Sequence, residues 1–286
     1  MRIKSGYFFM FSVGVLLSHA AFLSGQDNDF ENKSTDELAK ELANPNTPLT
    51  SLKFKHQFRT YKGDLSGAAD QASYIMLFQS TLPFPFKNGR TLWIRPSVPI
   101  VIGLPSYDVN TERFDSHSGL GEIVFDFQYG DTGEKGFLWS VGATGTMPTA
   151  TKTELGRNSW ALGPGFQLGH ISKKYVVGAF INHQWGFSNS KSNGYRLTTL
   201  QVFNVFLPTG GWSVASGPII SYNHTVDQLE FPLNFAVGKT VKINSRPWKF
   251  AIELNYYVSR YDTFGPQWMI GVNIAPVVKN VIANWI

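Results

Sequence analysis

In the stretch WKFAIELNYY, residues 248–257, the even-numbered and the odd-numbered positions carry different kinds of side chain. One parity is wholly apolar and aromatic: Trp248, Phe250, Ile252, Leu254 and Tyr256. The other parity includes a cation, an anion and an amide: Lys249, Ala251, Glu253, Asn255 and Tyr257. Successive residues of a β-strand point to opposite faces of the sheet. The stretch therefore predicts a strand with one face in an apolar phase and the other face in a polar one.

The same alternation continues along most of the chain from residue 50, and about twelve strands of roughly 9 to 13 residues can be traced. A tilted strand of this length crosses a bilayer. The connections alternate between short turns, such as 130–136, and longer loops, such as 103–118 and 147–159. This asymmetry is typical of outer-membrane barrels, whose short turns face the periplasm. An even number of strands places both termini at the short-turn end.

Alternation alone also fits a soluble β-sandwich or a cell-surface domain, whose apolar face would point inward. Aromatic residues near the predicted strand ends favour lipid instead, because such rings form girdles at the membrane boundary. They are Tyr61, Trp93, Tyr129, Trp139, Trp160, Tyr175, Trp185, Trp212, Tyr222, Trp248, Tyr256 and Trp268. Lipid offers no hydrogen bonds, so a spanning sheet has to close on itself. We therefore predict an all-β fold, a closed antiparallel transmembrane β-barrel of about twelve strands, with a short N-terminal helix.

The polar parity supplies candidates for residues that line the barrel lumen. They are Arg95, Glu122, Asp126, Asn182, Gln184, Lys249, Glu253 and Asn255. The charged members predict an inward ladder of opposite charges. This ladder is either a set of salt bridges that fills the lumen or a constriction that selects solutes by charge.

The first residues predict a signal peptide over 1–20, with Arg2 and Lys4 before a short apolar run. The run is too short for a spanning helix, although a membrane anchor is the alternative. Ser34 and Glu37 have the spacing of a capping box, which predicts a helix over 35–43 within a periplasmic segment 21–48. The predicted barrel covers 49–278, and 279–286 is a C-terminal tail. The helix either caps the lumen, stays in the periplasm or binds a partner helix.

Several other chemistries are not expected. The chain has no cysteine, and its 6 histidines form no ligand array, so we expect no metal and no cofactor. The formal net charge of +5 is too small to indicate nucleic-acid binding. His117 lies between two serines, which raises a barrel phospholipase as an alternative, but no orienting amide accompanies the pair. We expect no catalytic residue and no enzyme.

Seven segments together resemble a known family over nearly the whole mature chain. They are DELAKELANPNTPLTSL (36–52), YIMLFQSTLPFP (74–85), GLGEIVFDFQYG (119–130), PTATKTELGRNSWALGPG (148–165), GAFINHQWGF (178–187), SGPIISYN (216–223) and GPQWMIGV (265–272). The chain resembles Gram-negative outer-membrane barrels grouped as the MetA-pathway of phenol degradation family, often mislabelled neuromedin U. The resemblance implies porin-like passive transport of small solutes, with aromatic compounds as one candidate class.

The resemblance supplies no catalytic residues. A closed structural or adhesive barrel that binds through its extracellular loops is the alternative function. The expected partners are outer-membrane lipid, an unidentified small-molecule solute and the barrel-assembly machinery, and no nucleic acid is expected. The expected location is the outer membrane of a Gram-negative bacterium.

Overall fold

The computed structural model describes residues 32–187, 194–278 and 280. The predicted signal peptide lies outside these residues, as does the predicted tail apart from Asn280. One helix, α2 (Thr35–Ala43), precedes the sheet, as predicted, and two short 3-10 turns (Ala68–Asp70 and Thr153–Leu155) lie in loops. The strands are β1 (Thr50–Lys62), β2 (Ala72–Pro85), β3 (Thr91–Asp108), β4 (Arg113–Leu120), β5 (Ile123–Thr132), β6 (Phe137–Met147), β7 (Trp160–Ile171), β8 (Tyr175–Phe187), β9 (Arg196–Phe206), β10 (Trp212–Ser216), β11 (Ile219–Asn223), β12 (Gln228–Ile243), β13 (Arg246–Ser259) and β14 (Gly265–Val278).

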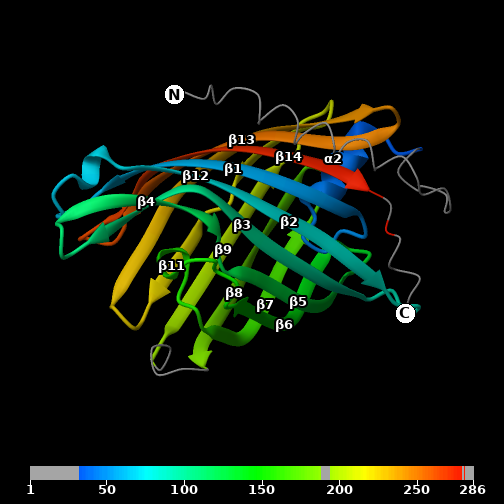
Figure 1. Ribbon diagram of the computed structural model, residues 1–286. Helices are drawn as coiled ribbons and strands as arrows, with labels where there is room; N and C mark the ends of the chain where they lie inside the picture. Colours follow the sequence, from blue (N-terminus) through cyan, green and yellow to red (C-terminus); the bar gives the residue numbers. More distant parts are fainter. Residues whose placement is uncertain (1–31, 188–193, 279, 281–286) are drawn as a thin grey trace.

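The strands form one closed antiparallel sheet (Figure 1). Most strands pair with their neighbours in sequence, β3 pairs with β5, and β1 pairs with β14 to complete the circle. β10 and β11 lie end to end between β9 and β12, and β4 pairs only with β3 outside the wall. The wall is therefore a barrel of twelve strands, as predicted. No helix of the described residues is long and apolar enough to span a membrane.

Two segments differ from the prediction. The loop predicted over 103–118 is largely a β-hairpin of β3 and β4, with Asp108 opposite Arg113 and the rings of Tyr107 and Phe114 5.0 Å apart. The single strand predicted over about 212–222 is interrupted between β10 and β11. The interruption falls at Pro218, which has no backbone N–H, and the N–H of Gly217 before it donates to Asn234 Oδ1 (2.6 Å) instead of the ladder.

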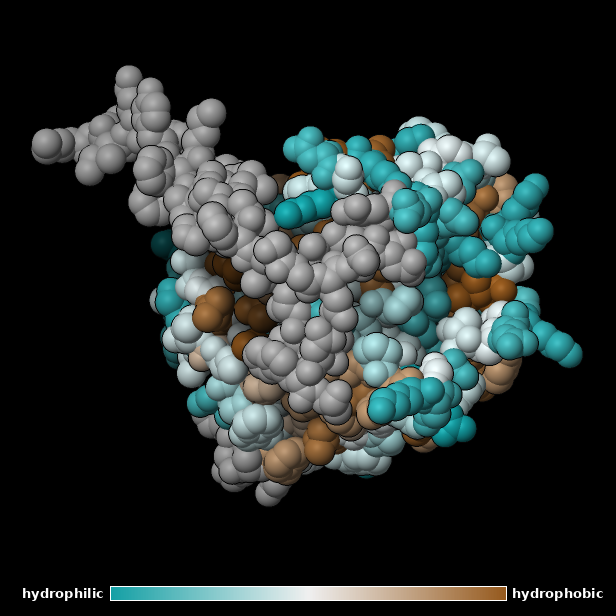
Figure 2. Space-filling view, turned by 90° about the vertical axis from the view of Figure 1, so that its right-hand side faces the viewer, coloured by the Kyte–Doolittle hydropathy of each residue, from teal (hydrophilic) through white to brown (hydrophobic). Residues whose placement is uncertain are grey.

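The apolar parity of the wall faces outward, as predicted. The exposed fractions of Ile252, Phe235 and Ile270 are 64%, 54% and 52%, although all three are large hydrophobic residues. Such a band of exposed side chains is stable only against hydrocarbon. Figure 2 looks at one end of the barrel, where hydrophobic side chains lie on the outer wall and hydrophilic ones project around the rim.

The assignment of Trp93 and Tyr61 to the aromatic girdle is wrong. Trp93 is only 1% exposed, and its Nε1–H donates to the carbonyl oxygen of Thr47 (3.0 Å). Tyr61 is buried, and its hydroxyl bonds to Ser73 Oγ (2.8 Å). Trp93 shares the inward parity of Arg95, so the strand register decides its face, not its residue type.

The two ends of the barrel differ in their connections. At the short-turn end the strands are joined by 86–90, 133–136, 172–174, 207–211 and 244–245. Asn244 and Ser245 in the last of these both have positive φ (48° and 62°), as a two-residue type I′ hairpin requires. At the other, long-loop end lie the β3–β4 hairpin and the longer loops. α2 and both ends of the barrel sequence, Thr50 and Val278, lie at the short-turn end (Figure 1).

Candidate functional site

The helix α2 lies inside the short-turn end of the barrel, between opposite walls (Figure 1). Ala39 is 2% exposed and belongs to an apolar cluster with inward-facing residues of β6, β7 and β8 and with a turn residue: Leu138, Ile171, Val176 and Leu207. Leu38 is fully buried and packs on the other side against Leu49 and Val277 of β14. α2 also contacts β10, β12 and β13. The helix therefore occupies the opening at this end.

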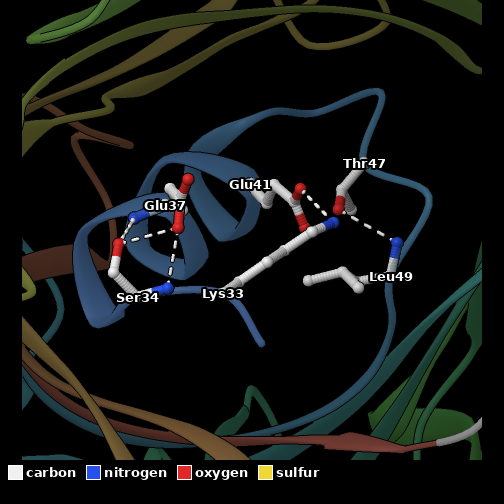
Figure 3. A network of polar contacts seen from close by, with 6 residues as sticks. All are labelled: Lys33, Ser34, Glu37, Glu41, Thr47 and Leu49. Carbon is white, nitrogen blue, oxygen red and sulfur yellow. Dashed lines mark hydrogen bonds and ion pairs between the residues drawn. The ribbon is translucent and has the colours of Figure 1, made fainter. Parts of the chain in front are cut away.

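Local contacts explain why such a short helix forms (Figure 3). Ser34 Oγ accepts the backbone N–H of Glu37 (3.2 Å), and Glu37 Oε2 accepts the backbone N–H of Ser34 (2.7 Å). This reciprocal capping box satisfies two N–H groups that the helix leaves unpaired. The backbone N–H and the hydroxyl of Ser34 lower the pKa of the Glu37 carboxyl. Lys33 and Glu41 add an ion pair of 2.7 Å along the helix.

The segment that joins α2 to β1, residues 44–49, is bonded to the barrel wall. Asn46 Nδ2 donates to the carbonyl oxygens of Asp131 (2.9 Å) and Trp139 (3.2 Å). The bond from Trp93 to the carbonyl of Thr47 attaches the segment to β3. The guanidinium of Arg95 donates to the carbonyl oxygen of Pro45. Hydrogen bonds to three strands thus hold the segment across the lumen.

The predicted ladder of opposite charges does not form ion pairs. Within residues 32–187, 194–278 and 280, the ion pairs are Lys33–Glu41 and Arg157–Glu122. Arg95 and Asp126 face each other across β3 and β5, but Asp126 accepts the hydroxyl of Thr144 (2.6 Å). Arg95, Asp126 and Glu253 bind neighbouring carbonyl, hydroxyl and amide groups instead. Glu122 pairs with Arg157, which was not among the predicted residues, and Lys249 forms no ion pair within the described residues.

Glu253 lies in a network of amides on three adjacent strands. Its Oε1 accepts from Asn234 Nδ2 (2.9 Å), and its Oε2 accepts from Asn273 Nδ2 (3.1 Å). Asn255 is 4% exposed and contributes a longer bond to Glu253 Oε1 (3.3 Å). Charge-assisted bonds of this kind stabilise a carboxylate without a cation beside it. Of the predicted lumen residues, Glu253 and Asn255 are therefore brought together.

Two predicted lumen residues lie on β8. Asn182 and Gln184 are 7% and 4% exposed. Gln184 Oε1 accepts the hydroxyl of Thr146 (2.9 Å), whereas Asn182 Oδ1 has no hydrogen-bond partner among the described residues. They share the interior with Glu253, but no hydrogen bond joins them to another predicted residue among the described residues.

Glu122 belongs to a different group, at the long-loop end. Its buried carboxylate pairs with Arg157 of the β6–β7 loop (3.2 Å) and accepts the backbone N–H of Asn158 (2.8 Å). The Arg157 guanidinium lies 3.8 Å from the centre of the Tyr195 ring. Burial raises the pKa of the Tyr195 hydroxyl, and the charge of Arg157 opposes this effect. Sequence reasoning missed Arg157 and Tyr195, because loop residues carry no periodicity that assigns them a partner.

Sequence reasoning also missed the cations nearest the helix end of the lumen. Lys53 and Lys55 have the inward parity of β1, beside Phe54 and Phe58 on the outward parity. The charges of Lys55, Arg95 and Lys249 all act on Lys53. The alternation of residues 52–59 contained this information, since every second residue there is basic or an amide. Among the described residues, no group of three or more histidine or acidic side chains is arranged to hold a metal ion.

Comparison with known proteins agrees with this architecture. The family model described as "Putative MetA-pathway of phenol degradation" matches residues 70–285. The crystal structure of the COG4313 outer membrane channel from Pseudomonas putida F1 is 14% identical, with a TM-score of 0.61 over 80% of this chain and 94% of that chain. The NanC porin is 8% identical, with a TM-score of 0.50 over 80% and 99%.

No curated protein matches the chain in sequence. The structural likenesses show a shared fold, and the family model covers most of the chain. The chain therefore belongs to the "Putative MetA-pathway of phenol degradation" family, and it is an outer-membrane β-barrel.

Proposed function

We propose that this barrel is a porin-like channel that passes small solutes, aromatic compounds among them, across the outer membrane. The observation that carries the proposal is the two-faced wall. On β13, Ile252 and Leu254 are exposed on the outside, while Glu253 and Asn255 lie in a polar interior. The fold shared with an outer membrane channel supports it, and the family description refers to phenol, an aromatic compound.

The proposal places the short-turn end in the periplasm, as in other barrels of this kind. α2 and residues 44–49 lie in that opening, so the structure with α2 docked corresponds to a state of low conductance. Passage of solutes larger than water and small ions then requires α2 to shift. Insertion of a closed sheet of this size depends on the barrel-assembly machinery.

The proposal assigns no catalytic role. The interior side chains described here are cations, carboxylates and amides, and the carboxylates bind hydroxyl and amide groups. Glu122, at the long-loop end, is bound to Arg157 and to the backbone, so its carboxylate serves a structural contact.

Purified protein in a planar bilayer tests the proposal. Discrete conductance steps are expected, with larger steps when α2 is displaced. The same preparation should migrate faster unboiled than boiled on a denaturing gel, which establishes that the barrel is folded. A folded barrel that leaves the bilayer ion-tight, with and without α2 docked, would overturn the channel and favour a closed structural or adhesive barrel.

A further inference from the structure

Four inward-facing cations form a group in the lumen near α2, which we call the basic cluster: Lys53, Lys55, Arg95 and Lys249. Lys249 pairs with Ala275 of β14, and Phe54 pairs with Ile274 on the other side of that strand. Lys53 and Lys249 consequently flank Ala275, with about 10 Å between their strands. Two lysine side chains at this separation reach a common point inside the barrel.

The lysines of the basic cluster have no anionic partner among the described residues, whereas Arg95 faces Asp126 across β3 and β5. None of the three lysines takes part in an ion pair or a hydrogen bond there. Arg95 donates to the carbonyl oxygen of Pro45, which is neutral. Glu253 and Asp126, the nearest inward carboxylates on β13 and β5, are bound to amides and to Thr144. Like charges inside a protein wall repel and are costly without a counter-charge. An anion in the lumen would remove that cost.

An apolar surface lies directly beside the cations. Lys55 pairs with Leu77 across β1 and β2, and Leu77 pairs with Pro99 on β3. These residues share the inward face. The ring of Trp93 lies 6.0 Å from the guanidinium carbon of Arg95. A ligand that matches this part of the lumen carries a negative group for the lysines and a flat apolar body for the neighbouring wall.

We propose that the basic cluster binds the carboxylate of small aromatic acids, with benzoate as the simplest member, while the ring lies against Leu77 and Pro99. Ammonium and guanidinium groups make strong charge-assisted bonds to carboxylates. An inorganic anion such as phosphate satisfies the charges but not the apolar wall. The inference rests on the proposed channel function and narrows its solutes to a chemical class.

Calorimetric titration of the folded protein in detergent tests the site without requiring conduction. The ligands are benzoate, benzyl alcohol as the neutral ring, and acetate as the anion without a ring. Benzoate is expected to bind more tightly than either. Lys53→Gln and Lys249→Gln are each expected to weaken benzoate binding roughly tenfold, as loss of a charged hydrogen bond does.

Lys87→Gln is the matched control, because Lys87 lies in the exposed turn between β2 and β3. This variant should bind benzoate as the unmodified protein does, and the unboiled gel shift should show that each variant is folded. Equal affinity for benzoate and benzyl alcohol, or equal losses in Lys87→Gln and Lys53→Gln, would overturn the cationic site. Equal affinity for acetate and benzoate would overturn the recognition of the ring.

The reversal potential of the channel in a salt gradient separates this inference from the proposed function. The unmodified protein is expected to favour anions, and the Lys53→Gln/Lys249→Gln double variant is expected to lose that preference. A conducting channel that is indifferent to charge contradicts the basic cluster and leaves the channel intact. Lysine-dependent benzoate binding by a barrel that never conducts supports the site and contradicts the channel.

Discussion

The two ends of the barrel are narrowed in different ways. At the short-turn end, α2 buries Leu38 and Ala39 against both walls, and the segment after it bonds to backbone carbonyls of the strands. At the long-loop end, the β6–β7 loop is held by the Glu122–Arg157 ion pair and by Arg157 over the Tyr195 ring. One end depends mainly on buried apolar surface, and the other combines the charged contact with hydrogen bonds of Thr149 and Thr151 to residues 120–123.

The two ends should therefore respond to different conditions. Burial of apolar side chains is insensitive to ordinary salt, whereas an ion pair with an exposed partner is weakened by screening. The short-turn end is therefore the more firmly closed one, and the long-loop end is the one that ionic strength loosens. Three experiments test this contrast between the ends.

The largest effect is expected from Leu38→Ala. Truncating a fully buried leucine side chain costs about 2–5 kcal/mol. Because Leu38 packs against Leu49 and Val277, this loss should reduce the free energy that holds α2 in the barrel. The helix itself should persist, because alanine is a good helix former. Single-channel recordings should show a higher open probability or larger steps. Leu42→Ala, at a position only partly buried, is the control with a smaller effect. Equal recordings for both variants and the unmodified protein would mean that α2 does not limit conduction.

A smaller effect is expected from Ser34→Ala and from acid. Loss of the cap costs about 1 kcal/mol of helix stability. The pKa of Glu37 is lowered by its bonds to Ser34, so the contribution of this pair is present above the ordinary carboxyl pKa and is lost as the pH falls through the lowered one. The protection of α2 against hydrogen exchange, taken relative to the intrinsic rate at each pH, should therefore fall below about pH 4.

Ser34→Ala itself provides the control for the acid experiment. The variant should exchange faster at neutral pH, and acid should then add little, because the bonds that lower the pKa of Glu37 are already gone. Protection that falls equally with pH in the two proteins would show that another group is responsible.

The smallest effect is expected from Arg157→Gln at the long-loop end. The Arg157 side chain is 38% exposed, so the ion pair with Glu122 contributes roughly 1 kcal/mol or less. The β6–β7 loop should be cut by trypsin at Lys152 up to about fivefold faster, and high salt should produce a similar acceleration in the unmodified protein. Arg113→Gln on the exposed hairpin is the control. Faster cleavage in both variants, or none in high salt, would remove the contrast between the ends.

The wall of the barrel could be predicted from sequence because its determinants are local. The parity of Phe250, Ile252 and Leu254 identifies the lipid face without knowledge of any partner strand. The same parity would have placed Trp93 inside with Arg95. The error at Trp93 came from letting residue type override register. The split of β10 and β11 was also foreseeable, since Pro218 stands in the middle of the predicted strand.

The position of α2 could not be predicted, because its partners are far away in the sequence. The narrow stripe of Leu38 and Leu42 gives no indication of where it packs. One signal was present: Leu138, near a short turn, is apolar on a parity of β6 that is otherwise small or polar. Apolar residues on the lumen side require another apolar segment that packs on them and excludes water. The charged groups show the same limit: the sequence placed them in the interior, but it could not identify their partners.

The segment 44–49 connects α2 directly to the first strand, and this connection has a kinetic consequence. A group tethered beside its binding site experiences a local concentration on the order of millimolar. If α2 leaves its position, it is therefore expected to return before a free copy of the helix at micromolar concentration can take its place. In the proposed channel, openings are accordingly expected to be brief and to end without a binding event from solution.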